Sequence, residues 1–412
     1  MRRRTVELAV LMVATAGLQA REFSLRNGDA GYCIPTNSTV LSNGSSFSLP
    51  GFPLPTQDPP LQQNRNERFR EVSLPTPTDE VIAAHDSDFV LKEFKFRDGE
   101  TLAELRLHYA TLGKPIRDAA GQVTNAVLLL HGTGGSGAQF SAPQFAGELF
   151  GAGQLLDTAK YYIILPDGIG HGKSSKPSDG LHAKFPQYDY DDMVAAHHAL
   201  LEHLGVQHLR LILGTSMGCM HSFVWGETYP DFMDAMMSLA CQPLQIAGRN
   251  RVWRKMVMDA IRNDPEWKGG EYAAEPKQGL RTALDLLLIA GSAPLQMQKN
   301  YPTRDAADKY LDDYFASRMP GLDANDLLYA VNASRNYDPL PNLEKIRARV
   351  MYVNSADDFI NPPELGIAER EIKRVKGARF VLLPVSDATR GHGTHTWAAV
   401  WKEYLRELLA GK

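Results

Sequence analysis

The sequence predicts an α/β fold: a mostly parallel sheet flanked by helices, with an inserted helical cap. Two observations carry this prediction. Short apolar runs typical of strands alternate with helical segments over most of the chain, which implies a parallel sheet covered on both faces. A long helical stretch then separates the last two strands from the others, and it predicts a cap that packs on the same domain.

The first 20 residues have the three parts of a secretory signal. Arginines at residues 2–4 precede an apolar stretch at residues 6–18, which Glu7 interrupts, and Leu18-Gln19-Ala20 offers a cleavage site. The apolar stretch is shorter than the roughly 20 residues that span a bilayer. We therefore expect cleavage after Ala20, export to the periplasm or the medium, and no stable membrane insertion afterwards.

Residues 21–77 are predicted to form a flexible N-terminal arm, because they are rich in Ser, Asn, Pro and Gly and have no sustained apolar period. Residues 78–412 are predicted to form the α/β domain, with the cap at about residues 244–338. The formal net charge of −4 offers no basic surface to a polyanion, which argues against nucleic acid as a partner.

The three cysteines are too few for a disulfide framework, so packing is expected to stabilise the fold. Cys33 lies in the predicted arm. Cys219 and Cys241 lie in apolar runs, where buried and inert thiols are expected.

The first ordered element is predicted to be a hairpin. Residues 89–96 and 103–109 form β-type runs around Asp98-Gly99, a pair that favours a tight turn. Further strands are predicted at residues 126–130, 161–165, 209–213, 235–239, 350–353 and 379–383. In the cap, an amphipathic helix is predicted from the four-residue spacing of Val252, Met256 and Ala260, beside Val257 and Ile261.

A nucleophile motif follows the strand predicted at residues 209–213. Gly214-Thr215-Ser216-Met217-Gly218 is a G-x-S-x-G sequence between that strand and a predicted helix. Its glycines permit a tight strand-to-helix turn that exposes the serine oxygen at the helix N-terminus. We therefore predict that Ser216 is the nucleophile of an acyl-transfer reaction.

A glycine-rich loop follows the strand predicted at residues 126–130. The loop reads His131-Gly132-Thr133-Gly134-Gly135, and the backbone N–H groups of Thr133 and Met217 are predicted to form the oxyanion hole. The loop lacks the Lys-Ser/Thr ending of a phosphate-binding loop and the spacing of a dinucleotide site. The histidines are too scattered for a metal-ligand pattern. We expect neither a cofactor nor a metal.

The acid and the base are expected downstream in the order Ser, Asp or Glu, His. Two pairs of candidates lie at the carboxyl ends of predicted strands, where open α/β sheets place their sites. Asp358 is preferred to Asp357 because it lies four residues before a proline. His392 is preferred to His395 because it follows a glycine and lies one turn before the closing helix. Asp357 and His395 stay open as alternatives.

Several stretches beyond residue 98 form one recognisable pattern: residues 99–102, 108–113, 125–132, 192–194, 214–218, 229–230, 260–267 and 391–392. In this combination the chain resembles the homoserine O-acetyltransferase family of α/β-hydrolase-fold proteins. The resemblance covers both the sheet and the first cap helix. It implies an α/β-hydrolase fold and a triad of Ser216, Asp358 and His392, in agreement with the motifs.

Two departures from the family pattern bear on the reaction. Met258 stands two residues before Ala260, where the family would place an arginine that pairs with the amino-acid carboxylate, and Cys219 replaces a second glycine after Gly218. With the predicted export, these departures favour a serine hydrolase that cleaves a small-molecule carboxylic ester. The alternative is an acyltransferase of the homoserine O-acetyltransferase type, moving an acyl group from acyl-CoA to an alcohol. Monomer and homodimer both stay open.

Overall fold

The computed structural model describes residues 84–411. The signal peptide predicted at residues 1–20 and the arm predicted at residues 21–77 lie outside the described residues. Within the described part, no helix is both long and apolar enough to cross a membrane.

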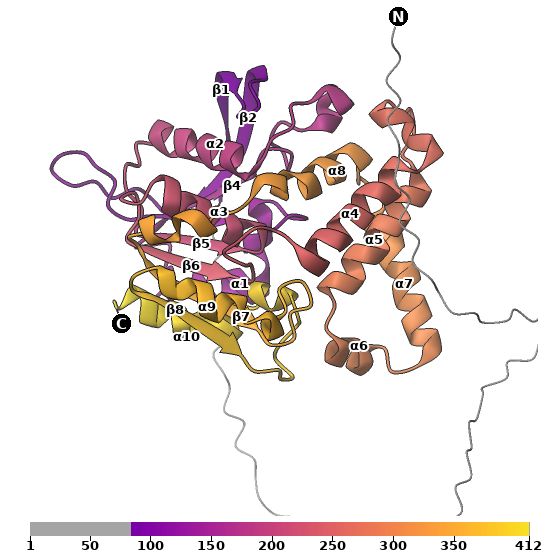
Figure 1. Ribbon diagram of the computed structural model, residues 1–412. Coiled ribbons are helices and arrows are strands. Elements are labelled where there is room, and N and C mark those ends of the chain that lie inside the picture. Colours follow the sequence, from indigo (N-terminus) through magenta and orange to yellow (C-terminus); the bar gives the residue numbers. More distant parts are fainter. Residues whose placement is uncertain (1–83, 412) are drawn as a thin grey trace, which may run out of the picture. The chain divides into compact units, whose positions relative to one another are not determined.

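One eight-stranded sheet organises the described chain, in the order β1-β2-β4-β3-β5-β6-β7-β8 (Figure 1). β1 (His85–Lys95) pairs antiparallel with β2 (Thr101–Leu112), which pairs antiparallel with β4 (Tyr162–Pro166). All other neighbours are parallel: β3 (Ala126–Leu130), β5 (Leu211–Thr215), β6 (Ala235–Leu239), β7 (Arg349–Ser355) and β8 (Ala378–Leu383). The predicted α/β-hydrolase fold, including its hairpin and its parallel strands, is confirmed.

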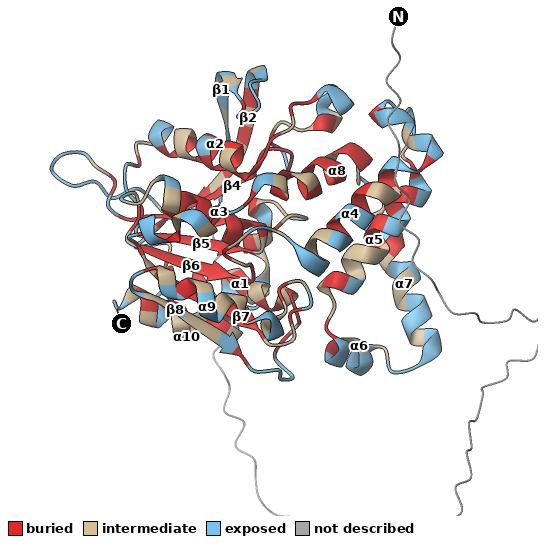
Figure 2. Cartoon of the chain, in the orientation of Figure 1, coloured by how far each residue is buried: buried red, intermediate tan, exposed pale blue. Residues whose placement is uncertain are grey.

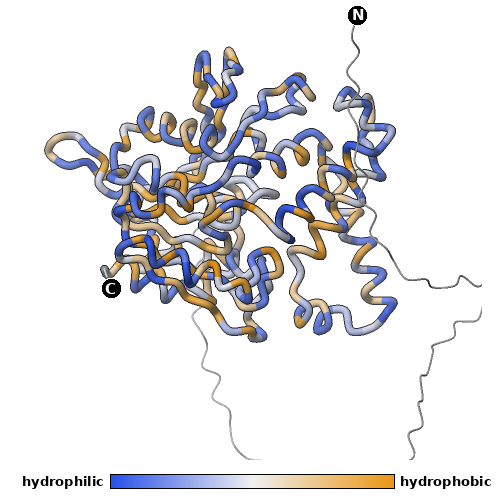
Figure 3. Tube along the Cα trace, in the orientation of Figure 1, coloured by the Kyte–Doolittle hydropathy of each residue, from blue (hydrophilic) through white to orange (hydrophobic). Residues whose placement is uncertain are grey.

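Each central strand contributes side chains to two hydrophobic cores, because successive side chains point to opposite faces of a sheet. In β3, Leu128 and Leu130 belong to the core packed against α2 (Tyr190–His203) and α3 (Met217–Thr228). Val127 and Leu129 belong to the core packed against α1 (Pro143–Leu149) and α10 (Ala398–Leu409). The central strands β3, β4, β5 and β6 are therefore buried on both faces, as Figure 2 shows, and Figure 3 shows the matching apolar colour.

The cap lies between β6 and β7 and gathers on one side of the sheet domain (Figure 1). Its helices are α4 (Gly248–Arg262), α5 (Lys277–Gly291), α6 (Pro294–Asn300), α7 (Arg304–Arg318) and α8 (Ala324–Asn332). A short helix, α9 (Ile367–Glu371), follows β7.

The predicted apolar face of α4 was partly wrong. Val257 and Ile261 are buried as expected, but Val252 and Met256 are each about half exposed. The buried face is rotated around the helix axis relative to the predicted face, and it includes Trp253, Arg254 and Met258. The periodicity fitted two neighbouring faces of the helix, and only the packing against α5 and α8 selects one of them.

The expectation of inert thiols was also wrong. Cys219, in the first turn of α3, and Cys241, just after β6, form a disulfide with their Cα atoms 5.7 Å apart. Both residues are buried, so the apolar context was read correctly. An apolar run predicts that a cysteine is buried, but it does not predict which other cysteine lies beside it. Here the packing of α3 against β6 brings together two cysteines that are 22 positions apart.

Candidate active site

The Ser216 backbone makes the sharp turn that the motif predicts. Ser216 lies between β5 and α3 with φ 54° and ψ −111°, a conformation that is costly for a residue with a side chain. The flanking glycines allow a close approach of backbone segments. A Cβ on Gly214 would lie 2.0 Å from the Gly218 carbonyl oxygen, and one on Gly218 would lie 1.9 Å from that of Leu130. This turn holds the serine hydroxyl at the carboxyl edge of the sheet.

Ser216, His392 and Asp358 form a continuous hydrogen-bonded chain. The Oγ of Ser216 lies 2.8 Å from Nε2 of His392. Nδ1 of His392 lies 3.1 Å from Oδ1 and 3.0 Å from Oδ2 of Asp358. This is the arrangement in which a histidine accepts the serine proton while a carboxylate orients the ring and stabilises the imidazolium.

The Asp358 carboxylate is held by its own loop. Its Oδ1 accepts hydrogen bonds from the backbone N–H groups of Ile360 at 2.8 Å and Asn361 at 3.1 Å, and its Oδ2 accepts one from the Asn361 side chain at 3.1 Å. Burial acts to raise the pKa of Asp358, but the nearby His392 and the Asn361 donors outweigh it, so the pKa lies below its ordinary value. Sequence reasoning missed Asn361, although its place directly before Pro362 in the acid loop was a usable signal.

The alternative acid, Asp357, faces a different partner. Its Oδ2 accepts hydrogen bonds from the Thr389 hydroxyl at 2.9 Å and from the backbone N–H of Gly391 at 3.0 Å. Asp357 therefore ties the acid loop to the loop that carries His392.

The alternative base, His395, packs behind His392. The two ring centroids are 5.1 Å apart at an interplanar angle of 76°. Burial lowers the pKa of His395 to about 3, and His392 acts in the same direction. His395 is therefore a neutral packing partner at neutral pH, and its geometry does not place it on Ser216.

The glycine-rich loop lies directly over the serine. A Cβ on Gly132 would be 3.4 Å from the Cβ of Ser216 and 3.9 Å from its Oγ. Within residues 84–411, the backbone N–H groups of Thr133 and Met217 donate to no backbone acceptor. Both N–H groups are thus free to donate to a ligand, as the predicted oxyanion hole requires.

Two side chains that sequence reasoning missed hold this loop in place. Gln139 accepts a hydrogen bond from the Gly132 N–H at 3.2 Å and donates one to the Thr215 hydroxyl at 2.8 Å. Nε2 of His171 lies 2.9 Å from the Thr133 carbonyl oxygen. The oxyanion loop is therefore fastened both to the nucleophile turn and to the loop after β4.

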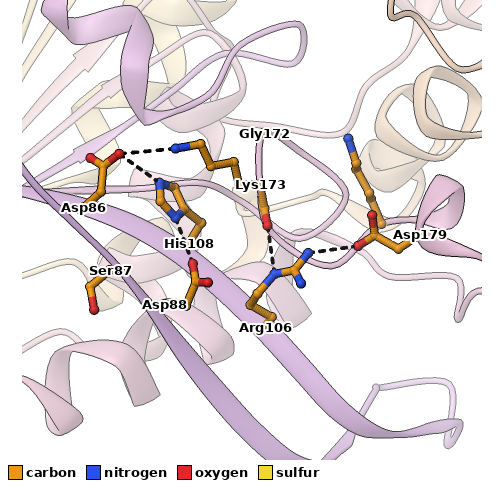
Figure 4. Close-up of a pocket in the computed structure, with 9 residues that line it drawn as sticks. Asp86, Ser87, Asp88, Arg106, His108, Gly172, Lys173 and Asp179 are labelled. Atoms are coloured by element: carbon orange, nitrogen blue, oxygen red, sulfur yellow. Dashed lines mark hydrogen bonds and ion pairs between the residues drawn. The ribbon is translucent and has the colours of Figure 1, made fainter.

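A cavity of about 530 Å³ lies elsewhere, where β1 and β2 meet the loop after β4 (Figure 4). Its charged side chains already pair with one another: Asp88 with His108 at 2.8 Å, Asp86 with Lys173 at 3.2 Å, and Asp179 with Arg106 at 3.2 Å. None of its lining residues belongs to the triad. Among the described residues, no cluster of three or more metal-ligating side chains is present.

The sheet, the turn at Ser216 and the order of the three hydrogen-bonded side chains are those of an enzyme of the α/β-hydrolase class. The model of the α/β hydrolase fold family matches residues 125–384, which is more than half of the chain. The chain therefore belongs to the α/β-hydrolase-fold family.

Individual relatives confirm the resemblance to homoserine O-acetyltransferases. The homoserine O-acetyltransferase of Haemophilus influenzae is 28% identical over 296 residues, which cover 64% of this chain and 81% of the relative. A probable acyltransferase of Methanothermobacter thermautotrophicus is 29% identical over 281 residues, which cover 68% of this chain and 84% of the relative.

Solved structures share the fold. The homoserine O-acetyltransferase of Bacillus anthracis superposes with a TM-score of 0.69 at 21% identity, covering 79% of this chain and 97% of that one. Esterase E22 superposes with the same TM-score and identity, covering 79% of this chain and 100% of that one. One fold thus carries both a transferase and a hydrolase.

Proposed function

We propose that the protein is an acyltransferase that forms an acyl-enzyme on Ser216 and passes the acyl group to the hydroxyl of a small molecule. The observation that carries the acyl-enzyme is the unbroken chain from Ser216 through His392 to Asp358. The departures at Met258 and Cys219 by themselves favour ester hydrolysis. The relatives named as homoserine O-acetyltransferase and as probable acyltransferase favour acyl transfer more strongly.

The proposed reaction has two matching halves. His392 takes the proton of Ser216 as the Oγ attacks the donor carbonyl, and the oxyanion accepts hydrogen bonds from the N–H groups of Thr133 and Met217. The leaving group departs with the proton from His392, which leaves the acyl group on Ser216. The acceptor hydroxyl then gives its proton to His392 and attacks the acyl-serine, and the proton returns to Ser216 as the new ester leaves.

Hydrolysis is the second candidate, and Met258 favours it. This residue is buried in α4 and has no charge with which to hold an acidic acceptor. Hydrogen bonds to charged groups contribute about 1.5–3 kcal/mol, so the loss of one would weaken such an acceptor roughly ten-fold to more than a hundred-fold. Water would then compete at its much higher concentration.

The two candidates differ in their products. We expect the purified protein to consume acetyl-CoA or p-nitrophenyl acetate and to form an O-acetylated product when a hydroxy-compound such as homoserine is added at about millimolar concentration. Acetate as the sole product, at a rate that the acceptor does not change, would establish the hydrolase instead.

Ser216→Ala provides the test of the acyl-enzyme. The variant should lose turnover with both donors and retain the thermal unfolding profile, because one hydroxyl contributes little packing. Ser317→Ala, on the exposed face of α7, is the matched control and should keep full activity. Activity in Ser216→Ala equal to that of the control would remove the nucleophile assignment.

We also propose that the protein is exported. The signal-like residues 1–20 support export, and so does the disulfide between Cys219 and Cys241, since disulfides persist mainly in oxidising compartments. N-terminal sequencing of the protein from its native host should find Arg21 first. A cytosolic protein that still carries residues 1–20 would contradict the proposal.

A further inference from the structure

The proposed base, His392, follows an exposed segment of the chain. Residues 384–388, which come directly after β8, are all exposed, and burial begins again only at Thr389. From the sheet domain, Asp357 holds the loop at the Thr389 hydroxyl, at 2.9 Å, and at the Gly391 N–H, at 3.0 Å. Exposed loops with few hydrogen bonds to the rest of a protein open locally at a small free-energy cost. A base that must stay within hydrogen-bond reach of its nucleophile has to be held more firmly than that.

The cap contributes a further contact to this loop through Gln296. This residue lies on α6 and is only 9% exposed. Its Nε2 donates to the carbonyl oxygen of Thr389 at 3.0 Å and to that of Asp387 at 3.1 Å. A side-chain amide has two N–H donors, so both are used on the loop. The two acceptors also fix the orientation of the amide, because its own oxygen would repel them.

The turn before α6 packs against the residue next to His392. Gly391 has φ 58°, and a Cβ on it would lie 3.0 Å from the Ser292 carbonyl oxygen and 3.3 Å from the Cβ of Ala293. Ala293 is 4% exposed, so this contact belongs to the buried part of the molecule. The cap therefore touches the loop both at Thr389 and at Gly391.

We propose that Gln296 is a positioning residue, which holds residues 387–391 so that His392 stays within reach of Ser216. The inference rests on the proposed function, since it concerns the base of the same reaction. Gln296 touches no reacting atom and acts through the backbone of the loop. Without it, His392 would move relative to Ser216, and a misplacement of about 1 Å can lower a rate by roughly a hundred-fold. One segment of the cap thus helps to set the geometry of the base.

A purely structural role for Gln296 predicts a different result, because the loop has a donor of its own. Nη1 of Arg390 lies 2.8 Å from each of the same two carbonyl oxygens, those of Asp387 and Thr389. If Arg390 were sufficient, loss of Gln296 would lower stability and leave kcat unchanged. Arg390 belongs to the loop itself, however, and its bonds to neighbouring residues do not fix the loop against the cap.

Gln296→Met tests the proposal, because it removes both donors and keeps the length of the side chain. Gln298→Met, on the exposed side of the same helix, is the matched control. With p-nitrophenyl acetate, well below the melting temperature, Gln296→Met should lower kcat by roughly ten-fold to a hundred-fold and leave KM within about two-fold of the wild type. The control should change neither. Gln296→Asn, whose amide is retracted by one methylene, should fall between the two.

A proton NMR measurement needs no turnover and therefore separates this inference from the proposed function. The Nδ1 proton of His392, hydrogen-bonded to Asp358, should give a low-field resonance that is absent in His392→Ala. We expect this resonance to shift or broaden in Gln296→Met and to stay unchanged in Gln298→Met.

Three results would overturn the positioning role: an unchanged resonance in Gln296→Met, a kcat equal to that of the control, or a rise in KM at constant kcat. If Gln296→Met does not fold, the kcat of Gln296→Asn decides the matter. Absence of p-nitrophenyl acetate turnover in the wild-type protein would contradict the proposed function, and the NMR comparison would still decide the role of Gln296.

Discussion

Asp357 and Asp358 are neighbours in the chain, but their carboxylates face different parts of one loop. Asp358 contacts the ring of His392 at 3.0 Å, whereas Asp357 accepts the backbone N–H of Gly391 at 3.0 Å. One carboxylate orients the imidazole and the other holds the backbone that carries it. Replacing each aspartate by asparagine should therefore affect catalysis in one case and mainly stability in the other.

Asp358→Asn should lower kcat by roughly 10⁴-fold, because a neutral amide neither selects the required tautomer of His392 nor stabilises its imidazolium. Asp357→Asn should lower kcat by less than about ten-fold and mainly lower the melting temperature, since hydrogen bonds to a charged acceptor are worth about 1.5–3 kcal/mol. Steady-state kinetics and thermal denaturation of both variants provide the comparison. The reverse pattern would make Asp357 the acid.

His392→Ala should be as inactive as Ser216→Ala, since members of a triad act as a unit and their losses do not add. His395→Ala should retain measurable turnover and lose stability, because it removes a buried ring packed 5.1 Å from that of His392. Both variants can be assayed with p-nitrophenyl acetate beside a thermal melt. An inactive but fully stable His395→Ala would identify His395 as the base.

The disulfide between Cys219 and Cys241 should stabilise the fold by about 3 kcal/mol, as expected for a cross-link that spans 22 residues. Dithiothreitol should therefore lower the melting temperature of the wild-type protein. The double variant Cys219→Ala/Cys241→Ala should start lower and not respond to the reductant. Three free thiols in the denatured, unreduced protein would show that no such bond forms.

The protein should lose stability as the pH falls below about 6.5, the ordinary pKa of histidine. Burial lowers the pKa of His197 to about 4, with His171 acting in the same direction, and burial also lowers the pKa values of His131, His171 and His221. Between about pH 6.5 and pH 4, His197 binds a proton in the unfolded chain but not in the folded chain. The free energy of unfolding therefore decreases as the pH falls through this range.

His197→Leu removes one of these groups and tests the cause. The fall in the free energy of unfolding between pH 7 and pH 4 should shrink by on the order of 3 kcal/mol, from the shift of His197 to about 4. Denaturant titrations at the two pH values measure it. His203→Leu, outside this buried cluster, is the control and should leave the pH dependence unchanged.

The sequence by itself determined the fold and the position of the strand-to-helix turn that carries Ser216. Buried parallel strands are continuous apolar runs, and the turn at Ser216 needs glycines at fixed positions, so both signals lie within a few consecutive residues. The same local reasoning narrowed the acid and the base to two neighbouring candidates each. Local reasoning could not choose between Asp357 and Asp358, because their side chains are identical and differ only in the direction in which the folded loop points them.

Only the tertiary structure decided the features that depend on contacts between distant segments. Cys219 and Cys241 are adjacent because α3 packs against β6, and Arg254 is buried because α4 presents that face to Ser334 and Val331. Helical periodicity allowed either of two faces of α4 to be the buried one. The neighbours that packing supplies decide which residues of α4 are buried, and no local pattern in the chain records those neighbours.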